Sequence, residues 1–210
     1  DEYRIGCMVT LRQLEMNASL ETYTDGAMKE ALKHIVGVQF RNLATVGGSI
    51  YGRFGFSDVL TIFLAMDSYV ELYKGGIVSM QEFAQMPYDN DILVRIIIKK
   101  SKEKLAYQSV RPAKTDFPTL TCAISRTVFG DEEVYRIVVG ARPSKAMIVV
   151  DEKGILKEGL TEKSIRQFAE YAAEQVPTES NMRGSAKYRT HLVKVLVMRV
   201  LESLKGEETC

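Results

Sequence analysis

The segment Thr45-Val46-Gly47-Gly48-Ser49 is the first part of the sequence whose residue types suggest chemistry. Glycine has no Cβ atom, so a ligand phosphate can come close to its backbone N–H groups. The hydroxyl groups of Thr45 and Ser49 add two further hydrogen-bond donors. The spacing fits neither the Rossmann nor the P-loop pattern, and an ordinary tight turn explains the two glycines as well.

Three charged residues are further candidates for contact with a ligand. A carboxylate at Asp58 can accept hydrogen bonds from a sugar hydroxyl, or Ser57 or Asp58 can simply cap the next helix. Arg111 and Lys114 offer a cation to an anionic ligand, although a solvated loop accounts for both of them. No Ser-His-Asp, Cys-His or paired-carboxylate arrangement stands out, so independent hydrolytic chemistry is not expected.

The composition excludes several classes of protein. Of the 210 residues 46% are hydrophobic and 26% charged, and the net charge is +1, which suits a soluble folded chain. The basic residues form no cluster for nucleic acid, and no apolar run approaches the ~20 residues of a membrane span. Three cysteines without a CxxC pair, and two histidines, give no disulfide framework, zinc site or iron–sulfur cluster. We therefore expect a cytoplasmic protein without a metal of its own, with Cys7 and Cys122 as small core residues.

Hydrophobic periodicity predicts the elements that must position the candidate residues in the first half. An apolar stretch at 57–66 indicates a buried helix, because apolar residues lie on nearly every side of it. A Gly-Gly pair between two short apolar runs indicates a hairpin. The sequence also predicts strands at 3–9 and 91–100, a short helix capped by Thr10 and a second helix capped by Asp25.

From about residue 104 the pattern changes to three strands with connections that suit an antiparallel meander, at 105–111, 119–129 and 133–141. A helix capped by Thr161 and a last helix capped by Ser185 follow, with Arg183 and Arg189 expected on the surface. These elements predict an α+β fold. We expect one domain at 1–103, a second at 104–206 with a three-stranded antiparallel sheet packed by helices, and a frayed tail at 207–210.

The order of these features resembles the FAD-binding subunit of the molybdenum hydroxylases, the family of xanthine dehydrogenase and carbon monoxide dehydrogenase. Members show an Arg-Asn pair, a TxGGN loop and then a Ser-Asp pair, matched here by Arg41-Asn42, Thr45–Ser49 and Ser57-Asp58. The segment MRGSAKYRTHLV is similar to the start of the family's final helix. The resemblance covers essentially the whole chain, and it implies that residues 1–103 are a mixed FAD-binding domain of the PCMH-like type.

The resemblance implies FAD as the cofactor and assigns residues to it. The backbone of Thr45–Ser49 is expected near the diphosphate, and Asp58 near the ribityl chain or the flavin end. Ile35 and Leu93 match apolar positions on the flavin side, and Lys114 is a further candidate.

Three departures from the family pattern weaken this assignment. Ser49 replaces the usual Asn, and Gln108 stands where xanthine dehydrogenases carry a Lys. The family's first flavin loop, of AGGTDL type, does not occur in the chain, and roughly 50 to 60 N-terminal residues are expected to be missing relative to the usual domain. The departures predict that FAD is held poorly, or not at all, by this chain alone.

The function that the resemblance implies is electron transfer within a complex. A molybdopterin-binding large subunit oxidises a substrate, an iron–sulfur small subunit carries the electrons to FAD, and NAD+ or another acceptor receives them. One alternative is a scaffold subunit of such a complex that has lost FAD. Another is a flavin-dependent cell-wall reductase of the same superfamily, which the RGSAKYR segment disfavours.

Overall fold

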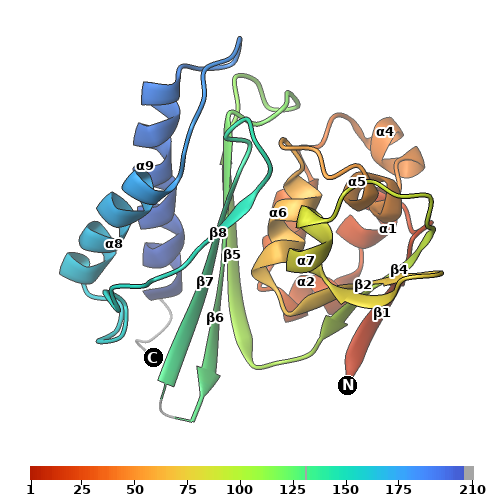
Figure 1. Cartoon of the computed structure of the whole chain (residues 1–210), viewed down its shortest axis with the longest axis horizontal. Helices are drawn as coiled ribbons and strands as arrows, with labels where there is room; N and C mark the ends of the chain where they lie inside the picture. The colour runs from red at the N-terminus through yellow and green to blue at the C-terminus, as the bar shows by residue number, and fades with distance from the viewer. Residues whose placement is uncertain (131, 206–210) are drawn as a thin grey trace.

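The computed structural model describes residues 1–130 and 132–205, which form two antiparallel four-stranded sheets with helices around them (Figure 1). The strand order is β1-β4-β2-β3 in the first sheet and β5-β6-β7-β8 in the second. The helices α8 and α9 cover one face of the second sheet, while α6 packs on its other face, towards the first sheet. The predicted α+β class is confirmed.

The first half contains the strands predicted at 3–9 and 91–100, the predicted hairpin and the buried helix. Three helices, α2, α4 and α5, were not predicted. In α2 only Leu20 is buried and in α4 only Arg41, so neither shows an apolar stripe, and α5 occupies the segment that was expected to be a glycine loop. The elements are β1 (Glu2–Gly6), α1 (Leu11–Glu15), α2 (Ala18–Tyr23), α3 (Ala27–Leu32), α4 (Val38–Leu43), α5 (Val46–Tyr51), α6 (Asp58–Ala65), β2 (Ser68–Leu72), β3 (Gly76–Ser79), α7 (Met80–Gln85) and β4 (Leu93–Lys99).

The second half contains the three predicted strands and one more. The additional strand, β8, has three residues, which is too short to show a periodic pattern in the sequence. The predicted tail at 207–210 lies outside the described residues. The elements are β5 (Glu103–Val110), β6 (Leu120–Phe129), β7 (Glu132–Gly140), β8 (Met147–Val149), α8 (Glu162–Gln175) and α9 (Ala186–Lys205).

The helix caps follow the sequence except at α3. Thr10 and Thr161 both cap their helices through capping boxes, as predicted. The cap of α3 is Gly26, in a left-handed conformation with φ 78°, and not Asp25. The carboxylate of Asp25 instead accepts a hydrogen bond from the Leu105 amide (3.3 Å), so a contact with the second half replaces the local cap.

Helix α6 joins the two halves of the molecule. All of its residues are buried, as its apolar sequence predicts, and it contacts β6 and β7. Thr61 Oγ1 lies 3.1 Å from Thr121 Oγ1, and Ser125 Oγ donates to the Ala65 carbonyl (2.5 Å). A Cβ atom on Gly140 would lie 2.4 Å from Thr61 Oγ1, so this close approach of helix and strand requires glycine.

The prediction that Arg189 lies on the surface is wrong. Its residue exposure is 1%, and its guanidinium donates to the Ala141 carbonyl (2.6 Å), the Thr119 carbonyl and Asn181. These bonds tie α9 to the ends of β6 and β7. The sequence could not show this, because the backbone carbonyls that stabilise a buried arginine leave no pattern in the chain.

Candidate functional site

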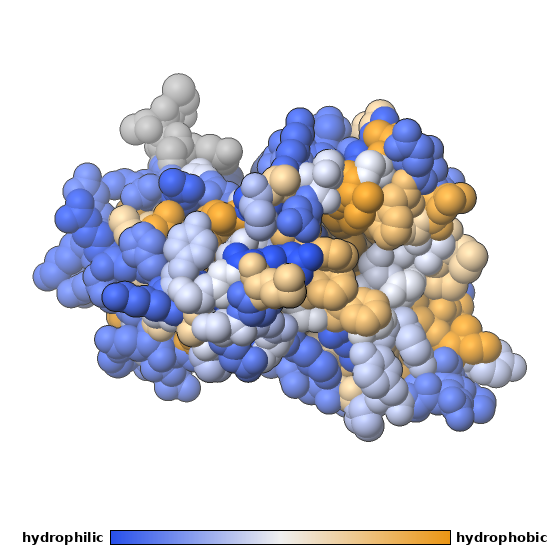
Figure 2. All heavy atoms as spheres, turned by 90° about the horizontal axis from the view of Figure 1, so that it is seen from above, coloured by the Kyte–Doolittle hydropathy of each residue, from blue (hydrophilic) through white to orange (hydrophobic). Residues whose placement is uncertain are grey.

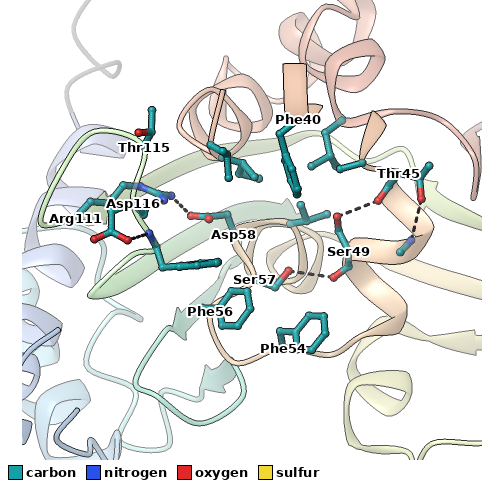
Figure 3. A pocket seen from close by; sticks show the side chains of 17 residues that line it. Phe40, Thr45, Ser49, Phe54, Phe56, Ser57, Asp58, Arg111, Thr115 and Asp116 are labelled. Carbon is teal, nitrogen blue, oxygen red and sulfur yellow. Dashed lines mark hydrogen bonds and ion pairs between the residues drawn. The ribbon is translucent and has the colours of Figure 1, made fainter. Parts of the chain in front are cut away.

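A cavity of about 630 Å³ lies between the end of α3, the helices α4 and α5, the start of α6 and the loop that follows β5 (Figure 3). Its volume falls within the usual range of small-molecule sites. Hydrophobic residues also gather near the middle of the face seen from above (Figure 2). The apolar walls of the cavity include Ile35, Val36, Phe40, Phe54, Phe56 and Phe117.

Three phenylalanines form one wall of this cavity. Phe54 and Phe56, from the segment before α6, stack with ring centroids 5.3 Å apart and an angle of 4° between the ring planes. Phe117, from the second half, meets Phe56 edge-on at 4.5 Å. Each of the three is between 43% and 52% exposed, so each keeps apolar ring surface in contact with solvent. A planar aromatic ligand placed against them would cover that surface.

The segment Thr45–Ser49 is the first turn of α5 with its cap, and not an open loop. Thr45 is the N-cap, and its hydroxyl oxygen accepts the Gly48 N–H. The hydrogen of this hydroxyl remains to donate to a further acceptor. The backbone amides that follow are bonded within the chain: Val46 to the Val9 carbonyl (2.9 Å), Gly47 to the Cys7 carbonyl (2.9 Å), Gly48 to Thr45 Oγ1 (3.2 Å) and Ser49 to the Thr45 carbonyl (3.1 Å).

The two adjacent glycines have different roles. A Cβ atom on Gly47 would lie 2.7 Å from Cys7 Cβ and 2.8 Å from the Cys7 carbonyl oxygen, so packing against the end of β1 requires glycine. A Cβ atom on Gly48 would meet only Thr45 Oγ1, at 3.3 Å, and Gly48 lines the cavity. Both residues are helical, so neither needs the left-handed freedom of glycine. Gly47 is therefore a packing residue, and Gly48 keeps space open in the cavity.

Asp58 is the first residue of α6 and takes part in a buried cluster at the cavity wall. Ser57 is the cap, because its hydroxyl accepts the Leu60 N–H (3.0 Å). Asp58 Oδ1 accepts hydrogen bonds from the Tyr107 hydroxyl and from the Arg111 guanidinium. Burial raises the pKa of Asp58 to about 6, although the charge of Arg111 and the two hydrogen bonds hold it down.

The guanidinium of Arg111 is bonded within this cluster. Its side chain is 7% exposed, and besides Asp58 it donates to the Asp116 carbonyl (2.7 Å) and to Ser109 Oγ (3.2 Å). It therefore holds the loop after β5 against α6 across the boundary between the halves (Figure 3). The Asp116 carboxylate, which also lines the cavity, pairs with Arg183 at 3.6 Å. Among the described residues that line the cavity, Arg111 is the one cation, and it has a carboxylate partner in Asp58.

The structure brings together part of the predicted set of site residues. Leu93 and Val46 are buried in the core, Gly47 packs on Cys7, and Lys114 is exposed beside the cavity without lining it. Whether any member of the set contacts FAD stays a prediction. The predicted residues that do line the cavity are Ile35, Thr45, Gly48, Ser49 and Asp58.

The aromatic side chains were missed by reasoning from the sequence. Phe54 and Phe56 lie in the segment RFGFSD, and Phe117 lies in TDF, between predicted elements. Large apolar residues in polar connections are the only signal, and such residues are common enough on protein surfaces to need no explanation singly. Their convergence became visible only with the tertiary structure.

Two other kinds of function receive no support. Within residues 1–130 and 132–205, no group of three or more His, Cys, Asp or Glu side chains could hold a metal ion. None of the helices described there is both long enough and apolar enough to cross a membrane.

Two family models match consecutive parts of the chain. The model for the FAD binding domain in molybdopterin dehydrogenase matches residues 1–100, and the model for the CO dehydrogenase flavoprotein C-terminal domain matches residues 105–204. Together they leave out only a short connection and the last few residues. A two-domain flavoprotein subunit is thus the class that the fold and the matches define.

Individual relatives agree with this class. The chain is 27% identical over 194 residues to the uncharacterized protein YgfM of Escherichia coli K12, covering 92% of this chain and 70% of that protein. It is 25% identical over 190 residues to the glyceraldehyde dehydrogenase medium chain of Sulfolobus acidocaldarius, covering 84% of this chain and 67% of the relative. Among solved structures, carbon monoxide dehydrogenase from Hydrogenophaga pseudoflava superposes with a TM-score of 0.86 at 21% identity, covering 98% of this chain and 75% of that one.

The chain belongs to the family of FAD-binding subunits of the molybdenum hydroxylases, a family of oxidoreductases. The family's cofactor is FAD, which combines a planar ring with a diphosphate. The aromatic walls of the cavity fit a planar ring. The amides of α5 and the Arg111 guanidinium already have partners, so the fit for a diphosphate is limited to the Thr45 hydroxyl and the open face at Gly48.

Proposed function

We propose that this chain is the FAD-binding, electron-transferring subunit of a molybdenum hydroxylase of the xanthine dehydrogenase type. The observation that carries the proposal is the cavity with aromatic walls, which both halves of the molecule build together. Phe54 and Phe56 come from one half and Phe117 from the other. A cavity that closes only when both family domains are in place is what a cofactor shared by the two domains requires.

Each of the lining residues has a distinct part in holding the cofactor. The phenylalanines cover the ring and keep water from one of its faces. Gly48 leaves room for the backbone to come close to the ligand, and the Thr45 hydroxyl donates a hydrogen bond to it. Asp58 acts through its bonds to Tyr107 and Arg111, which set the position of the loop after β5. When bound, FAD collects electrons and passes them on, and the protein supplies position and environment.

The wider assignment follows from the same proposal. We propose that a molybdopterin-binding large subunit and an iron–sulfur small subunit are the partners, that NAD+ or another acceptor receives the electrons, and that the complex works in the cytoplasm. The division into domains at 1–103 and 104–206 is part of the proposal. It is supported by the short connection between β4, which ends at Lys99, and β5, which begins at Glu103.

A second candidate function is a subunit that supports such a complex without FAD. The bonded amides of Val46–Ser49 and the paired charges of the cavity favour it, because they offer a diphosphate few free donors. A hydrogen bond to a charged group is worth about 1.5–3 kcal/mol, so a site that lacks several of them binds FAD weakly.

Titration of the purified chain, and of its native complex, with FAD separates the two candidates. We expect weak binding by the chain alone and tighter, saturable binding by the complex, seen as a change in flavin absorbance when the ring moves from water to the aromatic wall. Phe56→Leu and Phe117→Leu should weaken binding several-fold. Phe129→Leu is the matched control, since Phe129 is 64% exposed at the end of β6 and does not line the cavity. Absence of flavin from both chain and complex would support the scaffold subunit instead.

A further inference from the structure

Arg53 combines two unfavourable features at one position. Its backbone is left-handed, with φ 44°, although it is not glycine. Its side chain is among the largest that are fully buried, with a residue exposure of 2%. Among the residues that the structure describes, neither Nη1 nor Nη2 of its guanidinium has a hydrogen-bond partner. Strained backbone and unsatisfied buried polar groups concentrate at functional positions, so their coincidence needs an explanation.

The guanidinium of Arg53 lies among aromatic rings. Its carbon is 4.0 Å from the ring centroid of Phe83, 5.0 Å from that of Tyr88 and 5.3 Å from that of Tyr51. Its Nε donates to the Phe83 carbonyl on α7 (2.9 Å). These are cation–π distances, and the burial of the group strengthens such contacts. We call Tyr51, Arg53, Phe83 and Tyr88 the arginine cage.

The arginine cage fixes the end of α5 to the connection between α7 and β4. The Tyr51 hydroxyl donates to the Asp89 carbonyl (2.7 Å), and the Tyr88 hydroxyl donates to the Gly52 carbonyl (2.5 Å). The chain therefore turns at Arg53 in a conformation that is held by contacts outside the cavity. None of the four residues of the cage lines the cavity.

Arg53 connects two walls of the cavity in sequence. Before it, α5 contributes Gly48 and Ser49, and after it come Phe54 and Phe56. The far end of this segment is also fixed, because the Ala141 amide donates to the Gly55 carbonyl (2.8 Å). The Ser57 hydroxyl also donates to the Ser49 carbonyl (3.2 Å), so the turn at Arg53 and this bond together hold the α5 wall and the phenylalanine wall at a fixed separation.

We propose that Arg53 is a positioning residue that sets the separation between the α5 wall and the phenylalanine wall, and thereby the width of the slot for the planar ring of the ligand. The inference rests on the proposed function for the identity of that ring. The cage itself is independent of the ligand, since its contacts lie outside the cavity.

The test compares Arg53→Met with Arg136→Met. Methionine keeps most of the apolar volume but removes the charge, the planar stacking and the bond to Phe83. Arg136 is the matched control, because it also donates to a backbone carbonyl, that of Met66 (3.1 Å), and does not line the cavity. Arg53→Lys, which keeps the charge but not the stacking plane, serves as the second variant if the methionine variant does not fold.

The first readout is hydrogen exchange of residues 45–57 in the ligand-free chain. We expect at least tenfold faster exchange in Arg53→Met, a smaller increase in Arg53→Lys and wild-type rates in Arg136→Met. The second readout is FAD affinity, which should fall at least tenfold in Arg53→Met and stay at the wild-type level in Arg136→Met. Wild-type exchange in a folded Arg53 variant would overturn the inference. If the wild-type chain and its complex bind no FAD, the proposed function fails, while the exchange rates still decide the role of Arg53.

Discussion

The two sides of the cavity are built by different means. On the α5 side the shape depends on backbone and on absent side chains, with Gly47 against Cys7 and Gly48 facing the cavity. On the opposite side it depends on a buried ion pair, in which Arg111 holds the loop after β5 to Asp58. The shape of the α5 side should therefore change when a side chain is enlarged. The shape of the opposite side should change when one charge of the ion pair is removed.

This difference explains why one side is easier to find in a sequence than the other. Adjacent glycines in an apolar context are visible as a pattern, whereas Asp58 and Arg111 are 53 residues apart and look like any surface pair. It also predicts that substitutions on the two sides respond to different variables. Substitutions on the α5 side should depend on the size of the new side chain, and substitutions on the loop side should depend on pH.

Arg111→Met should have the largest effect. Removing one partner of a buried ion pair leaves the other charge uncompensated, which costs about 3–5 kcal/mol. We expect the free energy of unfolding to fall by this amount at pH 8, as measured by denaturant titration. The pKa of Asp58 is about 6, so at pH 5 the carboxyl is mostly neutral and the loss should be much smaller.

A comparison of the wild type with Asp58→Asn tests the other partner of the ion pair, through the pH dependence of the free energy of unfolding. The pKa of Asp58 is raised from 3.8 in the unfolded chain to about 6 in the folded one, so ionisation opposes folding. The neutral carboxyl contributes up to about 3 kcal/mol to the free energy of unfolding. This contribution is fully present below about pH 4 and is lost as the pH rises through 6. Asp58→Asn should lack this slope, and an equal slope in both proteins would show that Asp58 does not titrate in this range.

Gly47→Ala should have the next largest effect. The added Cβ would overlap Cys7 backbone and side-chain atoms, and overpacking of this kind costs about 1–3 kcal/mol. The better helix propensity of alanine offsets up to about 1 kcal/mol of that. We expect a lower thermal midpoint together with weaker FAD binding. If Gly47→Ala has the thermal midpoint of the wild type, β1 and α5 can move apart without a loss of stability.

Gly48→Val should leave the fold intact and act on the ligand. Its Cβ meets only Thr45 Oγ1, and the two methyl groups would occupy the cavity. We expect FAD affinity to fall at least tenfold, which is about 1.4 kcal/mol. The free energy of unfolding should change by less than about 0.5 kcal/mol, because valine is no worse than glycine in a helix. Unchanged affinity would place the ligand away from the α5 side.

Lys114→Ala should have the smallest effect. Lys114 is exposed and does not line the cavity, and substitutions at such positions usually change stability by less than about 0.5 kcal/mol. We expect FAD affinity within twofold of wild type by titration at low salt. A larger loss would show that the loop after β5 bends Lys114 over the ligand, which would add a cation to the loop side.

The sequence alone determined most of the elements and the family. The buried helix α6, the hairpin at Gly75 and Gly76 and the meander from β5 to β7 all follow from apolar periodicity and turn residues. The order of Arg41-Asn42, Thr45–Ser49 and Ser57-Asp58 was enough for the family resemblance, which the family models confirm. These are local properties, so a local pattern is sufficient to show them.

Only the tertiary structure decided what the residues of the site contact. It showed that the amides of Val46–Ser49 are bonded within the chain, that Arg111 is paired and that Arg189 is buried. It also brought Phe117 against Phe56 across the two halves. Hydrogen-bond partners, ion pairs and ring contacts join residues far apart in sequence. They depend on how α6 packs between the two sheets, and no local pattern carries that information.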